Sequence, residues 1–279
     1  MQSYPILVSS CDDAFAVGLA TMLKSVSINT HYHRIDTIVL DGGISEANKV
    51  KITKNFNNTN IKIEFITVND AVFSGFKTTA NITTSTYYRL LLPSILSADV
   101  GKVLYLDSDL IVECDVDELF SIRFQETIAA VPDMDKRAHF VSDQGGLKLY
   151  HELGIPATNR YFNAGVMLIN LDKWRFSNAS ERIIHYLSAN MEHVLWLDQD
   201  GLNAVLWNDW YELKPCYNVT TILYKVSSWE ESVFNKPGFD ELYLYPKILH
   251  YTHKKKPWHD NCNHPMKHRY WHYYNLLIW

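Results

Sequence analysis

The sequence has few cysteines, no excess of positive charge and no long hydrophobic run. Its four cysteines are far apart and form no C-x-x-C pair. This excludes a small disulfide-rich scaffold and is typical of a reducing compartment. The formal net charge is −5, and no RNA-binding or helix-turn-helix signature is present. Nucleic acid is therefore not an expected partner.

No stretch is long enough to span a bilayer. The first residues, MQSYPILVSSCDDAF, lack the basic start of a signal peptide, and serine and aspartate soon interrupt their apolar run. We therefore expect a cytoplasmic protein. With 279 residues, 47% of them hydrophobic, the chain has enough material for one main domain with a large core.

Strand-like and helix-like segments alternate along the chain. The apolar patterns predict strands at 5–9, 34–40, 61–68, 102–106, 127–131 and 160–170. They predict helices at 14–26, 45–56 with Ser45 as N-cap, 84–96 with a bend or break at Pro93, 171–190 and 199–207. Such alternation predicts an α/β fold in which helices cover a mostly parallel sheet.

Two aspartates follow the strand at 102–106, in the stretch KVLYLDSDLIVE. On an extended backbone, side chains two positions apart point the same way, so Asp107 and Asp109 would repel each other. Either one carboxylate takes up a proton, or a hard divalent cation neutralises both. The plainer alternative is a polar start to a loop, and the tripeptide alone favours this alternative.

Other polar residues are expected near this pair. In an open α/β sheet, ligands bind beyond the carboxyl ends of the strands, and Asp12 follows the first strand at that edge. Asp12 is also suited to be a helix N-cap. Far downstream, ILHYTHKKKPWHD offers His250 as a metal ligand and lysines for a phosphate. The alternatives are a core histidine and a solvated loop.

Taken together, several ordered motifs resemble the retaining sugar-nucleotide transferases of glycosyltransferase family 8. These motifs are LDGGISEAN, TYYRLLLP, KVLYLDSDLIV, RYFNAGVMLINLDKWR, LDQDGLN and HYTHKKKPWH. The resemblance is strongest to bacterial lipopolysaccharide galactosyl- and glucosyltransferases, with glycogenin more distant. It implies a GT-A fold over residues 1–262, a UDP-hexose donor (glucose or galactose), a saccharide or glycolipid acceptor, retention of configuration, and Mn²⁺ with Mg²⁺ as the alternative ion.

The resemblance also implies roles for individual residues. Metal ligands would be Asp107, Asp109 and His250, and Asp12 would bind the uracil ring. Contacts to the nucleotide, its phosphates or the donor sugar would come from Ser9, Ser10, Arg89, Ser108, Asp133, Asn163, Asp198, His253 and Lys256. His253 departs from the family pattern, because relatives often have a small residue there.

The same resemblance places Gln199 on the sugar face opposite the diphosphate. Since an amide is a poor nucleophile, we expect same-face substitution, in which Gln199 supports the positive anomeric centre through its carbonyl and Lys256 assists the leaving diphosphate. A covalent intermediate on Asp198 or Asp200 is the alternative.

Two segments remain open to more than one interpretation. Residues 263–279, which are rich in basic and aromatic side chains, fit either a peripheral contact with an anionic membrane on its inner face or a helix docked on the domain. Trp196 fits either a sugar-stacking position or the core.

Two alternative functions are a non-catalytic UDP-sugar-binding protein and a haloacid-dehalogenase-type phosphatase. The oligomeric state is not predicted.

Overall fold

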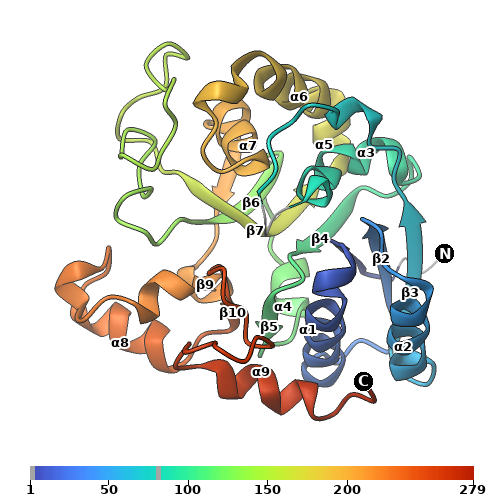
Figure 1. The fold of residues 1–279 in the computed structure, drawn as a ribbon. Coiled ribbons are helices and arrows are strands. Elements are labelled where there is room, and N and C mark those ends of the chain that lie inside the picture. Colours follow the sequence, from blue (N-terminus) through green and yellow to red (C-terminus); the bar gives the residue numbers. More distant parts are fainter. Residues whose placement is uncertain (1–3, 80–82) are drawn as a thin grey trace.

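A twisted sheet forms the centre of the protein (Figure 1). The computed structural model describes residues 4–79 and 83–279. Within them, seven strands lie in the order β3-β2-β1-β4-β7-β6-β8. All neighbouring pairs are parallel except those that involve β7, which runs opposite to β4 and β6. The strands are β1 (Ile6–Cys11), β2 (Ile35–Asp41), β3 (Ile61–Thr67), β4 (Lys102–Leu106), β6 (Ile128–Pro132), β7 (Phe162–Asn170) and β8 (Trp210–Glu212).

Helices cover both faces of this sheet, so alternate strand residues enter different cores. Leu7 packs into a core with α1 and α2, whereas the next residue, Val8, packs into a second core with α5, α6 and α7. The described α-helices are α1 (Ala16–Asn29), α2 (Glu46–Phe56), α3 (Leu92–Ile95), α4 (Asp117–Phe120), α5 (Leu171–Phe176), α6 (Ala179–Asn190), α7 (Asp198–Leu206), α8 (Lys236–Leu244) and α9 (Lys267–Tyr274). The described 3₁₀ helices are Asp13–Phe15, Ala71–Phe73, Thr84–Leu91, Met191–His193, Pro215–Tyr217, Thr221–Tyr224 and Trp229–Glu231.

A smaller sheet brings distant parts of the chain together. It contains β5 (Leu110–Val112), β10 (Ile248–His250) and β9 (Val219–Thr220) in that order. β10 runs antiparallel to β5, and His250 pairs with Leu110. The last residue of β10 is thus fixed beside the segment that follows Asp109.

Most predicted elements are present, and two expectations about local structure are wrong. Ser45 is the N-cap of α2, where its hydroxyl accepts a hydrogen bond from the Asn48 amide at 3.3 Å. The segment 84–96 breaks near Pro93 as expected, although its first part is a 3₁₀ helix. The predicted helix 171–190 is two helices, because the chain turns through Asn178, whose φ is 48°.

The second wrong expectation concerns the aspartate pair. Asp107 and Asp109 do not lie on an extended strand, because Ser108 and Asp109 form a turn between β4 and β5. Their carboxylates still approach each other. The turn, not the two-residue alternation of a strand, brings them together.

The C-terminal segment docks on the domain. α9 packs against α1, where Thr21 donates a hydrogen bond to the Tyr270 hydroxyl at 3.1 Å and Asn29 donates one to Tyr273 at 2.7 Å. The chain then ends beside α2, where Asn55 and Ile278 exchange two hydrogen bonds (Figure 1). Among residues 4–79 and 83–279, no helix has both the length and the hydrophobicity needed to cross a bilayer.

Candidate active site

Asp107, Asp109 and His250 converge at the carboxyl end of β4. One ligand atom from each lies within 4.8 Å of the others. His250 Nε2 is 3.2 Å from Asp109 Oδ1 and 3.7 Å from Asp107 Oδ2. The pairing of β10 with β5 explains how a residue so distant in sequence reaches the aspartates.

The orientation of the His250 ring fits a metal ligand. Its Nδ1 is 2.9 Å from the side-chain oxygen of Asn218, which only accepts hydrogen bonds, so Nδ1 must carry the proton. In a neutral ring, this leaves the lone pair on Nε2, which faces both carboxylates. One imidazole nitrogen and two carboxylates form a donor set suited to Mn²⁺ or Mg²⁺.

Buried cations surround the aspartates. Lys256 Nζ donates to Asp109 Oδ2 at 2.6 Å and to the Tyr251 carbonyl at 2.7 Å. Burial alone would raise the pKa of Asp109, but the charge of Lys256 and its hydrogen bond hold it well below its usual range. Asp109 is therefore ionised, as a metal ligand must be.

Arg89 joins the metal cluster to the next part of the site. Its Nη2 donates to Asp107 Oδ1 at 2.7 Å, and its Nε lies 3.1 Å from Asp198 Oδ2. The guanidinium also lies over the Tyr105 ring, 4.2 Å from its centre. Burial lowers the pKa of Arg89, but the charges of Asp107 and Asp198 raise it by more than burial lowers it. The side chain therefore stays charged.

The three polar residues at the start of α7 differ in their surroundings. Asp198 and Gln199 line the central cavity. Asp198 accepts a hydrogen bond from the Thr86 hydroxyl at 2.6 Å, and burial raises its pKa to about 6 despite Arg89. The side-chain oxygen of Gln199 accepts from the Ala164 amide at 3.0 Å, which fixes the amide group in place.

Asp200, by contrast, is a structural residue. It is 1% exposed and accepts hydrogen bonds from the Tyr161 hydroxyl and from the backbone amides of Leu195 and Trp196. It does not line the cavity. The expectation that Asp200 is an alternative nucleophile is therefore wrong, and Asp198 is the carboxylate of this helix that faces the site.

A chain of amides connects the metal cluster to Asp133. Asn218 accepts from His250 and donates to Asn163 Oδ1 at 2.9 Å, and Asn163 donates to Asp133 Oδ2 at 3.3 Å. Asn218 is fully buried. It was not singled out from the sequence, because a lone asparagine in CYNVT carries no motif.

Most of the residues that the resemblance assigns to the nucleotide line the cavity. Asp12 lines the cavity, and it also caps the 3₁₀ helix that follows it by accepting from the Phe15 amide at 3.2 Å. Ser10, Ser108 and His253 line the cavity as well. Ser9 does not: it is fully buried, and among the described residues its hydroxyl has no hydrogen-bond partner.

The cavity has a volume of about 560 Å³ and follows the rim of the sheet. Asp12 lies at the end of β1, the aspartate pair at β4, Asn163 on β7 and Asp133 after β6. At roughly 4.8 Å per strand, the ends of β1 and β6 are about 14 Å apart. The cavity is therefore long enough for an extended ligand with several distinct parts.

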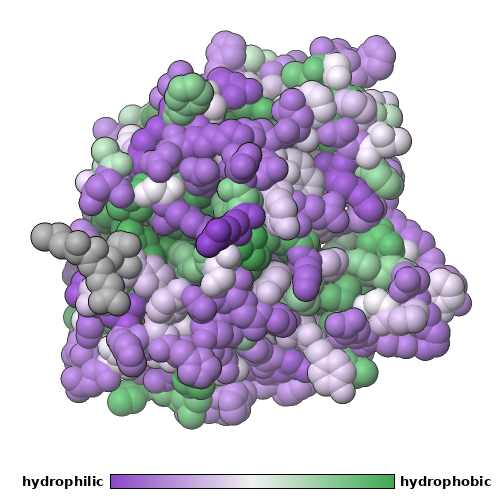
Figure 2. Space-filling model, turned by 180° about the vertical axis from the view of Figure 1, so that it is seen from behind, coloured by the Kyte–Doolittle hydropathy of each residue, from purple (hydrophilic) through white to green (hydrophobic). Residues whose placement is uncertain are grey.

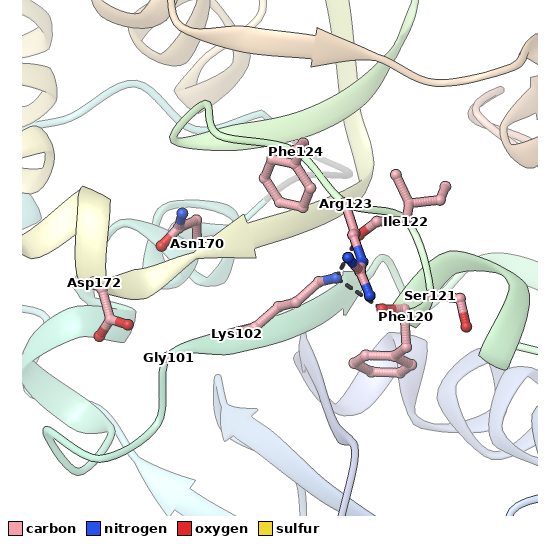
Figure 3. A pocket seen from close by; sticks show the side chains of 9 residues that line it. All are labelled: Gly101, Lys102, Phe120, Ser121, Ile122, Arg123, Phe124, Asn170 and Asp172. Carbon is pink, nitrogen blue, oxygen red and sulfur yellow. Dashed lines mark hydrogen bonds between the residues drawn. The ribbon is translucent and has the colours of Figure 1, made fainter.

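A second cavity, of about 750 Å³, lies at the opposite end of β4 (Figure 3). There Lys102 extends toward the loop after α4 and donates to the carbonyls of Phe120 and Ile122, both at 2.8 Å. Its ammonium thus holds the loop against the sheet. On the face in Figure 2, the surface is largely hydrophilic, and hydrophobic residues show in a central hollow and in scattered places toward the edges.

Comparisons with known proteins agree with this fold. The model of glycosyl transferase family 8 matches residues 6–262. The structure of galactosyltransferase LgtC with donor and acceptor sugar analogs has a TM-score of 0.82 and 29% identity, covering 98% of this chain and 96% of that one. General stress protein A of Bacillus subtilis is 29% identical over 98% of this chain and 94% of its own length. A lipopolysaccharide 1,2-glucosyltransferase of Escherichia coli is 29% identical over 70% of this chain and 56% of its own length.

The fold and the site together define a glycosyltransferase with a GT-A fold, as the sequence predicts. Because the family match extends over nearly the whole chain, the protein belongs to glycosyl transferase family 8. This membership excludes the phosphatase interpretation of the aspartate pair.

Proposed function

We propose that the protein transfers glucose or galactose from a UDP-sugar to a hydroxyl of a saccharide or glycolipid, with retained configuration and with Mn²⁺, or Mg²⁺, as cofactor. The observation that supports this most is the convergence of Asp107, Asp109 and His250 at the middle of an elongated cavity. These three residues would hold the ion. When bound, it would stabilise the negative charge of the leaving diphosphate as a Lewis acid.

The donor would lie along the rim of the sheet. Asp12 would accept a hydrogen bond from the uracil ring at the end of β1, and Ser10 and Ser108 would approach the nucleotide. The sugar would lie near Asp133, Asn163 and Asp198, which line the far part of the cavity. Because the pKa of Asp198 is about 6, this residue is mostly ionised at neutral pH and is able to accept a hydrogen bond from a sugar hydroxyl.

The reaction would proceed on one face of the sugar. The bond from the anomeric carbon to the phosphate oxygen breaks, the bond to the acceptor oxygen forms, and the acceptor proton moves to the leaving phosphate, giving UDP and the glycoside. Lys256 would compensate the diphosphate charge. Gln199, held by Ala164, would direct a remaining lone pair of its carbonyl to the anomeric carbon.

The first test is UDP release from UDP-glucose and UDP-galactose by the purified protein, with Mn²⁺ and with EDTA, counting slow hydrolysis as activity. We expect release from one donor that EDTA abolishes. Asp109→Asn and His250→Ala should reduce it at least about 100-fold, since changing a residue that only hydrogen-bonds a metal ligand already costs about 10–100-fold. Gln125→Glu, on an exposed loop, is the matched control.

If both donors give no UDP release although calorimetry shows UDP binding, the result would point to a strict acceptor requirement or to the alternative of a non-catalytic sugar-nucleotide-binding protein. A glycosyl adduct trapped on Asp198 would replace same-face substitution with a covalent intermediate. Full turnover in Gln199→Ala would remove Gln199 from the mechanism.

The C-terminal segment supports a second, separate proposal of peripheral membrane contact. Although α9 is docked, Leu276 is 48% exposed and Ile278 is 82% exposed. The segment also contains Lys267 and Arg269, whose positive charge would favour an anionic surface. Sedimentation with anionic vesicles should fall in Leu276→Ser/Ile278→Ser and stay unchanged in Val50→Ser, an exposed position on α2. Equal sedimentation of both variants would contradict the proposal.

A further inference from the structure

The outer part of the cavity contains cations that the donor does not need. Arg137, Lys225 and Lys254 all line it. Arg137 follows β6, beyond Asp133, and Lys225 follows the 3₁₀ helix Thr221–Tyr224. If the donor runs from Asp12 to Asp133, these side chains border the space that remains for the acceptor.

The other cations of the cavity have partners. Arg89 binds Asp107 and Asp198, and Lys256 binds Asp109. In contrast, no residue in the described part of the chain accepts a hydrogen bond from the ammonium of Lys225 or of Lys254, and neither forms an ion pair. The cavity therefore presents free positive charge on its acceptor side.

Arg137 is held in a defined position. Its Nε and Nη2 bind Asp135, with Nη2 2.6 Å from Oδ2, and Asp135 in turn accepts from the Arg137 amide at 2.9 Å. This leaves the Nη1 group without a bond to any described residue, while 68% of the side chain is exposed. A guanidinium fixed in this way can donate to an anion with little further ordering.

The positive charges that line this part of the cavity repel one another, which changes the pKa values of Lys225 and His253. Burial and the charge of Arg137 lower the pKa of Lys225, and Asp135 offsets this only in part. Burial together with Lys225 and the neighbouring lysines also lowers the pKa of His253. An anion placed among these groups would relieve their mutual repulsion.

We propose that the acceptor carries an anionic group, a phosphate or a carboxylate, beside the hydroxyl that receives the sugar, and that Lys225 and Arg137 bind this group. The inference rests on the proposed function, because it takes the space beyond Asp133 as the acceptor site. Trp196 lines the cavity, is 49% exposed and donates to the carbonyl of Gly145, whose amide donates to the Arg137 carbonyl, so it is placed to cover one face of the acceptor ring.

The test compares three probes that differ in charge: methyl β-glucoside, its 6-phosphate, and methyl β-glucuronide. Their binding to the wild-type protein is measured by calorimetry with saturating UDP and Mg²⁺, so that the diphosphate site is filled. We expect one anionic probe to bind at least about tenfold more tightly than the neutral one, as for charge-assisted hydrogen bonds. Which probe gains distinguishes phosphate from carboxylate.

Variants locate the anion. Lys225→Gln and Arg137→Gln should each remove most of the preference, whereas Lys62→Gln, on β3 at the far edge of the sheet, should keep it. Equal binding of all probes, no binding of any of them, or a preference that survives in both variants would overturn the proposal. UDP release by the wild-type protein without acceptor is measured in parallel. If the wild-type protein releases no UDP but still prefers an anionic probe, the proposed function is refuted while the anion-binding site remains supported.

Discussion

The side-chain oxygen of Asn218 lies 2.9 Å from Nδ1 of His250 and sets the tautomer of that ring. The same asparagine donates to Asn163, which donates to Asp133. One buried amide therefore orients a candidate metal ligand and, through a neighbour, a carboxylate expected at the sugar. Such outer residues are often as important for a metal site as the ligands.

Replacing Asn218 should weaken metal binding without touching a ligand. In Asn218→Ala we expect the Mn²⁺ concentration for half-maximal UDP release to rise about 10–100-fold, because Nδ1 of His250 loses its acceptor. Asn218→Asp keeps that acceptor but loses the donor to Asn163, so it should keep the metal dependence and raise the KM for the donor. Asn60→Ala, which also removes a hydrogen-bonded amide, is the control. An unchanged Mn²⁺ titration in Asn218→Ala would contradict this role.

Gly165 is required by the close approach of the metal cluster. A Cβ at this position would lie 2.2 Å from His250 Cε1 and 2.9 Å from Asp107 Oδ2. Since β10 fixes the His250 backbone, Gly165→Ala should displace one or both ligands and reduce Mn²⁺-dependent UDP release by at least about 100-fold. Gly238→Ala in α8, where the nearest atom is 3.1 Å away, should keep activity. Circular dichroism checks that both variants fold, and wild-type Mn²⁺ dependence in folded Gly165→Ala would be the contrary result.

The sequence predicts the order of elements well because periodic burial determines them. β4 has the predicted bounds, and the aspartates after it are at the rim of the sheet as expected. The sequence does not reveal Asn218, Arg137 or Lys225, because their positions depend on β9, β10 and the loop after β6. Short strands and loops are placed by contacts far along the chain, which periodicity does not record.

The wrong expectations have specific structural causes. The segment 171–190 is helical in pattern on both sides of Asn178, and only the left-handed backbone there, common for asparagine, separates α5 from α6. Asp200 looks like a second active-site carboxylate by spacing alone. It is removed from that role by three donors, two of them backbone amides that no sequence pattern places.

The C-terminal helix should contribute to the stability of the whole domain. Tyr270 and Tyr273 are 1% and 5% exposed, so deleting residues 267–279 would uncover α1 and the apolar surface that they bury. We expect the deletion to unfold at a clearly lower urea concentration. Tyr270→Phe, which loses the hydrogen bonds of the hydroxyl with Thr21 and with the Val17 carbonyl, should cost about 1 kcal/mol. Leu276→Ser, at an exposed position, should lower the stability less than either change. Equal urea midpoints for the deletion and the wild type would refute a stabilising role of the docked helix.

His264 should make the protein less stable in mild acid. Its ring lies between Tyr224 and Tyr251, its Nδ1 accepts from the Met266 amide at 3.1 Å, and no described residue accepts a hydrogen bond from its buried Nε2. Burial, with smaller contributions from Lys225 and His253, lowers its pKa from 6.5 to about 4. Neutral His264 is therefore the form that the folded protein keeps.

Between pH 6.5 and pH 4 the unfolded chain binds a proton at His264 that the folded chain does not, so falling pH favours unfolding in this window. The contribution is fully present above pH 6.5 and should shrink by about 1–3 kcal/mol toward pH 4. Urea unfolding of wild type and His264→Phe at several pH values isolates it. The variant also loses the Met266 bond, but that loss is the same at every pH, so the difference in slope reports the titration. Parallel curves for wild type, His264→Phe and the exposed control His33→Phe would show that protonation of His264 does not oppose folding.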